Sequence, residues 1–266
     1  MSEPSVQDVA DWWATAVSRV EPDVIELRGR PIQELIGTTS FVGVIWLLLR
    51  GAPPTPGQQR LLEAALVSSV DHGPHAPSIA IARMAVTCGI GINGAIASGV
   101  NTLGDVHGGA GEQCMEMLAE VGRRAAGGTG IDDAAAAVVA GWRDHVRYLP
   151  GFGHRFHSVD PRREPLLSLV RESVAAGVVD GAYLRAAEAV ERNLATGRSR
   201  PVPINVDGLT AVVYGELGFP PPLARGLFVL SRSVGILAHA WEEAGQGRRN
   251  KGPIPPSILP TYGGPS

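Results

Sequence analysis

Lysine is almost absent from this chain of 266 residues. Of its 23 basic residues, Lys251 is the only lysine and the others are arginines. Catalysis through a lysine Schiff base, or a phosphate-binding loop that ends in lysine, therefore has almost no candidate residue. Cysteine is equally scarce. Cys88 and Cys114 form no motif pair, which predicts a reducing cytoplasmic compartment rather than a disulfide scaffold.

An excess of positive charge is also missing, since 26 acidic residues give the chain a net charge of −3. A nucleic-acid partner is therefore not expected. The hydrophobic share of 44% supplies enough apolar surface for a core and excludes disorder. The acidic N-terminus predicts no signal peptide. The uncharged stretch 84–104 is long enough to span a membrane, but its glycines and polar residues predict a buried, close-packed helix pair instead. No membrane partner is expected.

Extended alternation of apolar and polar residues is lacking too, with at best one short strand over 24–28 before a turn at Gly29. Apolar residues instead recur at three- and four-residue steps, which predicts an all-α protein. Asp160 and Pro161 predict a helix N-cap and first helical residue. Helices are expected over 6–17, 61–66, 77–88, 115–121, 132–146, 166–170 and 219–241, and loops over 104–111, 149–161 and 196–203, before a non-helical tail over 245–266.

Several familiar motifs are matched only in part. The glycines over 89–94 have the spacing of a dinucleotide-binding loop, but a helical pattern precedes them and the next acid, Asp105, comes too soon. Close helix packing or a turn explains them better. The spacing of the histidines would permit zinc, but no cysteine pairs or H-E-x-x-H helix support it. These histidines are His72, His75, His154 and His157. The sequence has no G-x-S-x-G serine-hydrolase motif.

A more specific set combines imidazoles, one carboxylate and two arginines. His107 and His154 lie among glycines, Asp207 lies in an apolar entry to a helix, and Arg162 and Arg232 need anionic partners. Burial would raise the pKa of Asp207 and make it a better base. Taken singly, each residue also has a purely structural interpretation. His107 would be a loop histidine with satisfied hydrogen bonds, Asp207 an N-cap, and Arg232 a member of a core ion pair. Together they suit proton abstraction beside a thioester carbonyl and attack on a keto acid.

These residues stand in motifs that resemble the citrate synthase superfamily. The motifs, in order, are Ile36–Phe41 with Leu47–Gly51, His107-Gly-Gly-Ala, Gly-Phe-Gly-His154-Arg with Asp160-Pro-Arg162, Asn205-Val-Asp207, and Ser231-Arg232-Ser-Val-Gly235. The resemblance extends over about 20–262. Within the superfamily, three motif sequences look more like those of citryl-CoA lyase, including the lyase module of ATP-citrate lyase. They are Asp71-His-Gly-Pro74, Leu103 to Gly109 and Asn205 to Gly208. The short chain also favours the lyase form.

The resemblance implies an all-α homodimer that needs no metal. A large helical domain would comprise 1–110 and 211–266, a small domain would comprise 111–210, and the active site would lie in the cleft between them. The substrates would be an acyl-CoA and a 2-oxo acid, with the coenzyme A thioester as co-substrate.

The same resemblance implies a role for each site residue. Asp207 would exchange the proton of the acetyl methyl group, His107 would donate a hydrogen bond to the enolate oxygen, and His154 would bind the keto oxygen. The 2-oxo acid's carboxylates would be held by His72, Arg162 and Arg232, beside Phe228. The backbone of Leu149, Gly151, Phe152 and Gly153 would lie along the pantetheine arm of coenzyme A.

One departure concerns a further arginine that synthases carry just before a proline near the C-terminus. Here glycine precedes Pro253, and Arg248, Arg249 or Lys251 would have to complete the carboxylate clamp. The function expected is reversible cleavage or formation of a C–C bond between an acyl-CoA and a 2-oxo acid. The alternatives are a true synthase, which also hydrolyses the thioester, and a non-catalytic subunit that kept the fold.

Overall fold

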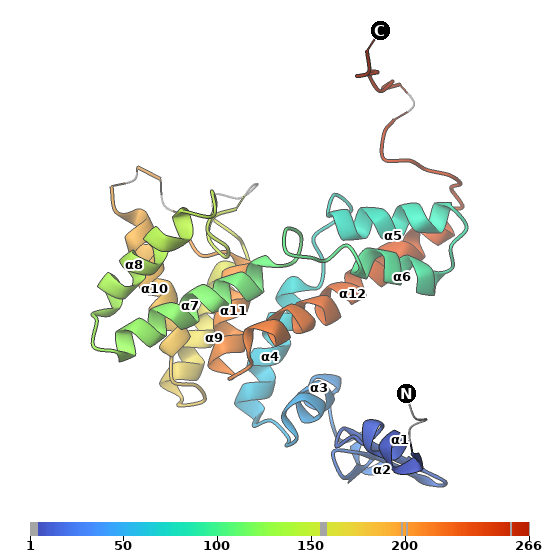
Figure 1. The fold of residues 1–266 in the computed structure, drawn as a ribbon, viewed down its shortest axis with the longest axis horizontal. Coiled ribbons are helices and arrows are strands. Elements are labelled where there is room, and N and C mark those ends of the chain that lie inside the picture. Colours follow the sequence, from blue (N-terminus) through green and yellow to red (C-terminus); the bar gives the residue numbers. More distant parts are fainter. Residues whose placement is uncertain (1–4, 155–158, 198, 201, 256, 266) are drawn as a thin grey trace. The chain divides into compact units, whose positions relative to one another are not determined.

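The computed structural model describes residues 5–154, 159–197, 199–200, 202–255 and 257–265, and these are mostly helical (Figure 1). The predicted all-α class is confirmed, with one small sheet in addition. Contacts along the chain define two units, Met1–Glu63 and Ala64–Ser266, which are described separately. The predicted division into 1–110 with 211–266 and 111–210 stays a prediction.

The first unit contains the sheet. Its elements are α1 (Val6–Trp12), β1 (Ser18–Glu21), β2 (Val24–Leu27), β3 (Arg30–Pro31), α2 (Ile32–Leu35), α3 (Phe41–Arg50) and the start of α4 (Pro56–Ser69). The strands pair antiparallel in the order β1-β2-β3, with Ser18 opposite Leu27 and Glu26 opposite Pro31. The expected strand over 24–28 is thus confirmed as β2, but β1 and β3 were not predicted. The expected helix over 6–17 ends earlier, at Trp12.

The second unit continues from the end of α4. Its helices are α5 (Pro77–Thr87), α6 (Ile92–Val100), α7 (Ala110–Ala126), α8 (Ile131–Arg143), α9 (Arg163–Ala175), α10 (Ala182–Ala195), α11 (Val206–Glu216) and α12 (Pro221–Gly245). The long helix α12 packs against α5, α6 and α7, and α11 packs against α7, α9 and α10. Figure 1 shows α5 and α6 along one end of α12, while α7 to α11 gather at its other end.

The stretch 84–104 forms parts of two helices, as predicted, and not one continuous span. A turn at Gly89, with φ of +87°, separates α5 from α6. A Cβ atom on Gly99 would lie 2.8 Å from the carbonyl oxygen of Ser78 and 2.9 Å from Ile236, so the glycine permits close helix packing. Among the described residues, α12 alone is long and apolar enough to cross a membrane, a test that the core helix of a soluble protein also meets.

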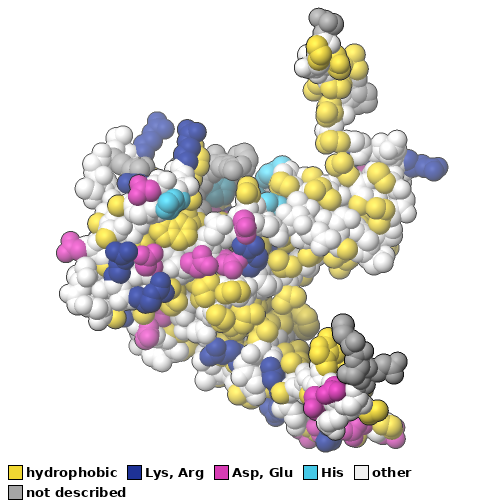
Figure 2. Space-filling model, viewed as in Figure 1, with side chains coloured by type: hydrophobic (Ala, Val, Ile, Leu, Met, Phe, Trp, Pro, Cys, Tyr) yellow, Lys and Arg dark blue, Asp and Glu magenta, His cyan; other side chains and the backbone are white. Residues whose placement is uncertain are grey.

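The charged residues are distributed unevenly over this unit. Figure 2 shows acidic and basic side chains over α7, α8 and α10, whereas the surface over α5 and α6 is nearly free of them. Arg83 is the one charged residue in α5 and α6 together. On α12, an exposed apolar stripe recurs at steps of three and four residues and consists of Leu230, Val234, Leu237 and Trp241.

Candidate active site

Asp207 lies in the first turn of α11. The helix is capped by Asn205, whose side-chain oxygen accepts a hydrogen bond from the backbone N–H of Gly208 at 3.1 Å. The alternative interpretation of Asp207 as an N-cap is therefore wrong. Burial raises the pKa of Asp207, and the positive charges of Arg162 and Arg232 only partly oppose this effect. A carboxyl group with a raised pKa is a stronger base than an exposed one and suits proton transfer.

The segment before His154 is fixed to the start of α11 by two hydrogen bonds from Asn205. The Asn205 N–H donates to the Gly151 oxygen at 2.9 Å, and the Asn205 side chain donates to the Gly153 oxygen at 2.6 Å. Gly151 has φ of +80°, and a Cβ atom there would lie 2.4 Å from Sγ of Cys114 and 2.8 Å from Cα of Gly208. Only glycine fits, which keeps this segment close to Asp207.

His107 follows a tight turn and contacts the N-terminus of α5. Its Nε2 atom lies 3.2 Å from the backbone nitrogen of Ser78 and 3.0 Å from the Ser78 hydroxyl. Because the backbone N–H can only donate, Nε2 accepts, and the ring proton is on Nδ1. Burial, and after it the charge of Arg232, lowers the pKa of His107. The ring is thus a neutral imidazole, and no described residue accepts from its Nδ1–H.

Arg232 is buried in α12 without a carboxylate partner among the described residues. Its Nε donates to the carbonyl oxygen of Ser69 at 3.0 Å, and its guanidinium lies 4.9 Å from the centre of the Phe228 ring. The alternative interpretation of Arg232 as a member of a core ion pair is therefore wrong as far as the described residues show. Phe228 also lies against Gly108, where a Cβ atom would be 3.1 Å from the ring. Phe228 therefore connects Arg232 to the turn that carries His107.

Arg162 does have a structural acid as its partner. Its Nε and Nη2 atoms donate to the two carboxylate oxygens of Asp160, each at 2.9 Å, and Nη1 donates to the oxygen of Ser68 at 3.2 Å. Three of its five N–H groups are thus used within the described residues. The remaining two have no acceptor among the residues that the structure describes.

Asp160 has a different role from the predicted one. The helix α9 begins at Arg163 with Arg162 as its N-cap, so the prediction of Asp160 as N-cap and Pro161 as first helical residue is wrong. Instead, the buried Asp160 carboxylate also accepts from the N–H of Val206 at 3.2 Å. Burial alone would raise the pKa of Asp160, but the hydrogen bonds from Arg162 and Val206 lower it to about 2.

Three imidazoles approach one another beside these arginines. The ring centres of His72 and His154 are 5.9 Å apart, and those of His72 and His75 are 5.3 Å apart. Burial lowers the pKa of His72, and the charges of Arg162 and Arg232 lower it further. The considered zinc ligand His157 lies outside the described residues. Among the residues that are described, no group of three or more His, Cys, Asp or Glu side chains is arranged to hold a metal ion.

Six of the predicted residues therefore form one electrostatic cluster, in which the charge of one member shifts the pKa of another. These residues are His72, His107, His154, Arg162, Asp207 and Arg232. The sequence did not reveal Ser78 as the partner of His107, because the two residues are 29 positions apart. The three candidates for completing the clamp lie near the end of α12. Arg248 is 4.0 Å from Glu243, and the Lys251 N–H donates to the hydroxyl of Thr87 at 3.0 Å.

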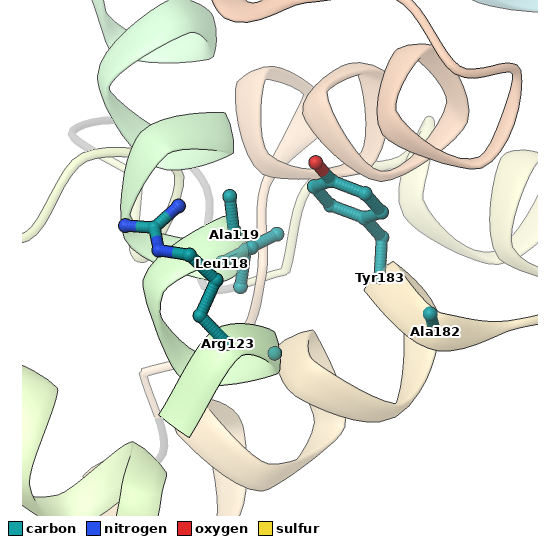
Figure 3. A pocket seen from close by; sticks show the side chains of 6 residues that line it. Leu118, Ala119, Arg123, Ala182 and Tyr183 are labelled. Atoms are coloured by element: carbon teal, nitrogen blue, oxygen red, sulfur yellow. The ribbon is translucent and has the colours of Figure 1, made fainter. Parts of the chain in front are cut away.

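A separate cavity of about 250 Å³ lies between α7 and α10. Figure 3 shows Tyr183 on one side of it and Arg123 on the other, with Leu118 and Ala119 between them. It is lined by Leu118, Ala119, Gly122, Arg123, Ala182 and Tyr183. None of the predicted site residues lines this cavity, so it is distinct from the cluster around Asp207.

Residues 52–253 match the C-terminal domain of citrate synthase, and the chain belongs to the citrate synthase family. Among solved structures, citryl-CoA lyase from Hydrogenobacter thermophilus is 29% identical, with a TM-score of 0.82 over 96% of this chain and 95% of that chain. ATP citrate lyase from Methanothrix soehngenii, solved with citrate and coenzyme A, shares the fold at 22% identity, with a TM-score of 0.81 over 100% of this chain and 43% of that chain.

Curated relatives of this chain include proteins named citrate synthase. The citrate synthase of Deinococcus radiodurans is 30% identical over 205 residues, which is 76% of this chain and 52% of that protein. The chain spans about half the length of that relative, and 37% of the glyoxysomal citrate synthase of Cucurbita maxima. The family and the fold are thus shown, and the predicted resemblance is confirmed.

Proposed function

We propose that the chain is a citryl-CoA lyase-like enzyme, which cleaves or forms the C–C bond between an acetyl (or another acyl) group on coenzyme A and oxaloacetate or a related 2-oxo acid. The observation that carries this proposal is the convergence of a buried carboxyl with a raised pKa, an imidazole that can donate from Nδ1, and two arginines with N–H groups that have no acceptor among the described residues. Asp207, His107, Arg162 and Arg232 supply these groups.

In the cleavage direction, His154 takes the proton of the citryl hydroxyl group as that oxygen becomes the keto oxygen of the 2-oxo acid. The C–C bond breaks, and its electron pair moves into the thioester to form an enolate. The Nδ1–H of His107 donates to the enolate oxygen, and Asp207 gives its proton to the carbon to yield the acyl-CoA. A raised pKa suits Asp207 for this step, because the carboxyl must hold a proton before it can donate one.

Substrate carboxylates are bound by the positive groups around this carboxyl. Several N–H groups of Arg162 and Arg232 have no acceptor in the described part of the chain, and a guanidinium suits planar, bidentate contacts with a carboxylate. His72 lies 5.9 Å from His154, measured between ring centres, and close enough to both arginines that their charges lower its pKa. Its imidazole can donate a hydrogen bond to a substrate carboxylate. Phe228 packs under the guanidinium of Arg232 and keeps it in place.

Coenzyme A is a substrate in this proposal, and the segment from Leu149 to Gly153 lies along its pantetheine arm. The close approach of Gly151 to Gly208 leaves this segment without side-chain bulk on the side of α11. The protein acts as a homodimer, which the nearly uncharged surface over α5 and α6 and the apolar stripe on α12 support. The reaction as written needs no metal.

The preference for a lyase over a synthase rests on two observations. The likeness to the citryl-CoA lyase structure extends over nearly the whole of both chains. In addition, the sequences of the motifs around His72, His107 and Asp207 resemble those of lyases. A true synthase is the second candidate, because the curated relatives carry that name. The two differ in whether the thioester is hydrolysed.

One assay separates these readings. The purified protein is incubated with citryl-CoA while oxaloacetate and free thiol are followed, and then with acetyl-CoA and oxaloacetate. A lyase produces oxaloacetate from citryl-CoA without free thiol, whereas a synthase releases thiol in the condensation direction. Asp207→Asn is expected to lower the turnover rate by roughly 10³-fold, since general acid–base catalysis contributes about 10²–10⁴-fold. Asp133→Asn, at an exposed position in α8, is the matched control.

No turnover in either direction would contradict the proposal and favour a non-catalytic subunit. An Asp207→Asn variant as active as the wild type would contradict the role of Asp207 as the proton donor.

A further inference from the structure

The turn that carries His72 rests directly on α12. A Cβ atom on Gly235 would lie 2.4 Å from the carbonyl oxygen of Val70 and 2.9 Å from the carboxylate of Asp71. One helical turn further along, Nε2 of His239 is 3.3 Å from Oδ2 of Asp71. The same carboxylate oxygen accepts the N–H of Gly73 at 3.2 Å. Asp71 therefore closes the turn on one side and contacts α12 on the other.

The second ring nitrogen of His239 contacts α5. Its Nδ1 atom is 3.4 Å from Nη1 of Arg83. A guanidinium can only donate and a carboxylate can only accept, so Nδ1 accepts from Arg83 and the Nε2–H donates to Asp71. One neutral tautomer satisfies both contacts. A protonated ring would instead turn a second donor, and a like charge, toward the guanidinium.

Arg83 is itself held firmly by α12. Its Nη2 and Nε atoms lie 2.6 Å and 2.7 Å from Oε2 of Glu243, which is buried. Its Nη1 atom also lies 3.0 Å from the more exposed carboxylate of Glu242. This pairing fixes the guanidinium that orients His239, since a buried carboxylate keeps its partner in place. Contacts thus continue from Glu243 through Arg83 and His239 to Asp71, the neighbour of His72.

We propose that His239 is a positioning residue, which holds Asp71 so that the His72 imidazole meets a carboxylate of the 2-oxo acid. This inference rests on the proposed function, in which His72 binds that carboxylate. Within the described residues, the polar contacts of the His239 side chain are with Asp71 and Arg83. Its loss therefore affects the binding of the 2-oxo acid and leaves the chemistry at Asp207 in place.

The test compares three substitutions in the full-length protein. His239→Ala is expected to raise KM for oxaloacetate roughly tenfold, which is the effect of losing a hydrogen bond to a charged group. The kcat value and KM for acetyl-CoA should change by less than about twofold. His239→Gln should recover most of the affinity, because its amide supplies a donor to Asp71 and an acceptor to Arg83. His239→Asn is one bond shorter, fails to reach Asp71 and should behave like His239→Ala.

His145→Ala, which removes an exposed histidine after α8, is the control for loss of an imidazole. An unchanged KM for oxaloacetate in His239→Ala, or equal loss in His239→Gln and His239→Asn, would overturn the inference. If His239→Ala does not fold, the comparison of the Gln and Asn variants carries the test. If the wild type has no turnover, the proposed function fails. The His72 ring resonances in NMR spectra then decide: they should shift in His239→Asn but not in His239→Gln, and unchanged resonances in both overturn the inference.

Discussion

Replacing Gly151 by alanine tests the packing that holds His154 near Asp207. The new Cβ atom would lie 2.4 Å from Sγ of Cys114 and 2.8 Å from Cα of Gly208, and its residue would have φ of +80°. A left-handed conformation costs an alanine about 1 kcal/mol, and overpacking costs about 1–3 kcal/mol. We expect the free energy of unfolding to fall by about 3 kcal/mol, measured by urea denaturation.

The control is Gly122→Ala, in the same helix as Cys114, where a Cβ atom meets nothing within 4 Å. Alanine there should stabilise the protein by about 0.5–1 kcal/mol, because glycine is a poor helix former. Adding Cys114→Ala to Gly151→Ala should restore part of the loss, since it removes the contact with Sγ but not that with Gly208. If Gly151→Ala unfolds like the wild type, the segment yields freely and its packing does not position His154.

Three further predictions follow from single contacts. Asp160→Asn should lower the free energy of unfolding by about 2 kcal/mol at pH 7, because the pKa of Asp160 in the folded protein is about 2 rather than 3.8. The wild type, but not the variant, should lose this stability as the pH falls from about 4 toward 2, which urea denaturation measures. Nitrogen NMR at pH 7 should show His107 as the neutral Nδ1–H tautomer, and a protonated Nε2 would contradict the contact with Ser78. Gly235→Ala should lower the melting temperature and raise KM for the 2-oxo acid, whereas Gly226→Ala on the same helix meets nothing within 4 Å and should not.

The helical character of the fold follows from residue spacing, because a 3.6-residue period repeats over many turns of α7, α9 and α12. The strand β3 escaped prediction because two residues are too few for an alternating pattern. The strand β1 escaped because Val20 is its single apolar residue and most of the strand is exposed. The predicted start of α9 was wrong because an Asp-Pro pair indicates a helix start from neighbouring residues alone, without regard to other partners of the Asp160 side chain. The arginine at 162 draws the carboxylate into an ion pair instead.

The sequence predicted which acids, bases and arginines lie near one another, because these residues stand in ordered motifs. What these side chains bind inside the protein was not predictable. Ser78 donates to His107 through its backbone, and Ser68 and Ser69 accept from Arg162 and Arg232 through their carbonyl groups. Every residue except proline carries these same backbone groups, so no side-chain pattern marks the positions that use them.

The two arginines of the site share one support, since consecutive carbonyl groups at the end of α4 receive them from distant parts of the chain. Successive helical residues are rotated by about 100° and rise by about 1.5 Å, so the last turn of α4 sets the spacing of the two guanidinium groups. Changing the length of that turn by one residue would redirect both together. For redesign toward longer or shorter acids, the end of α4 is therefore a single point of control, although it contributes no side chain to the arginines.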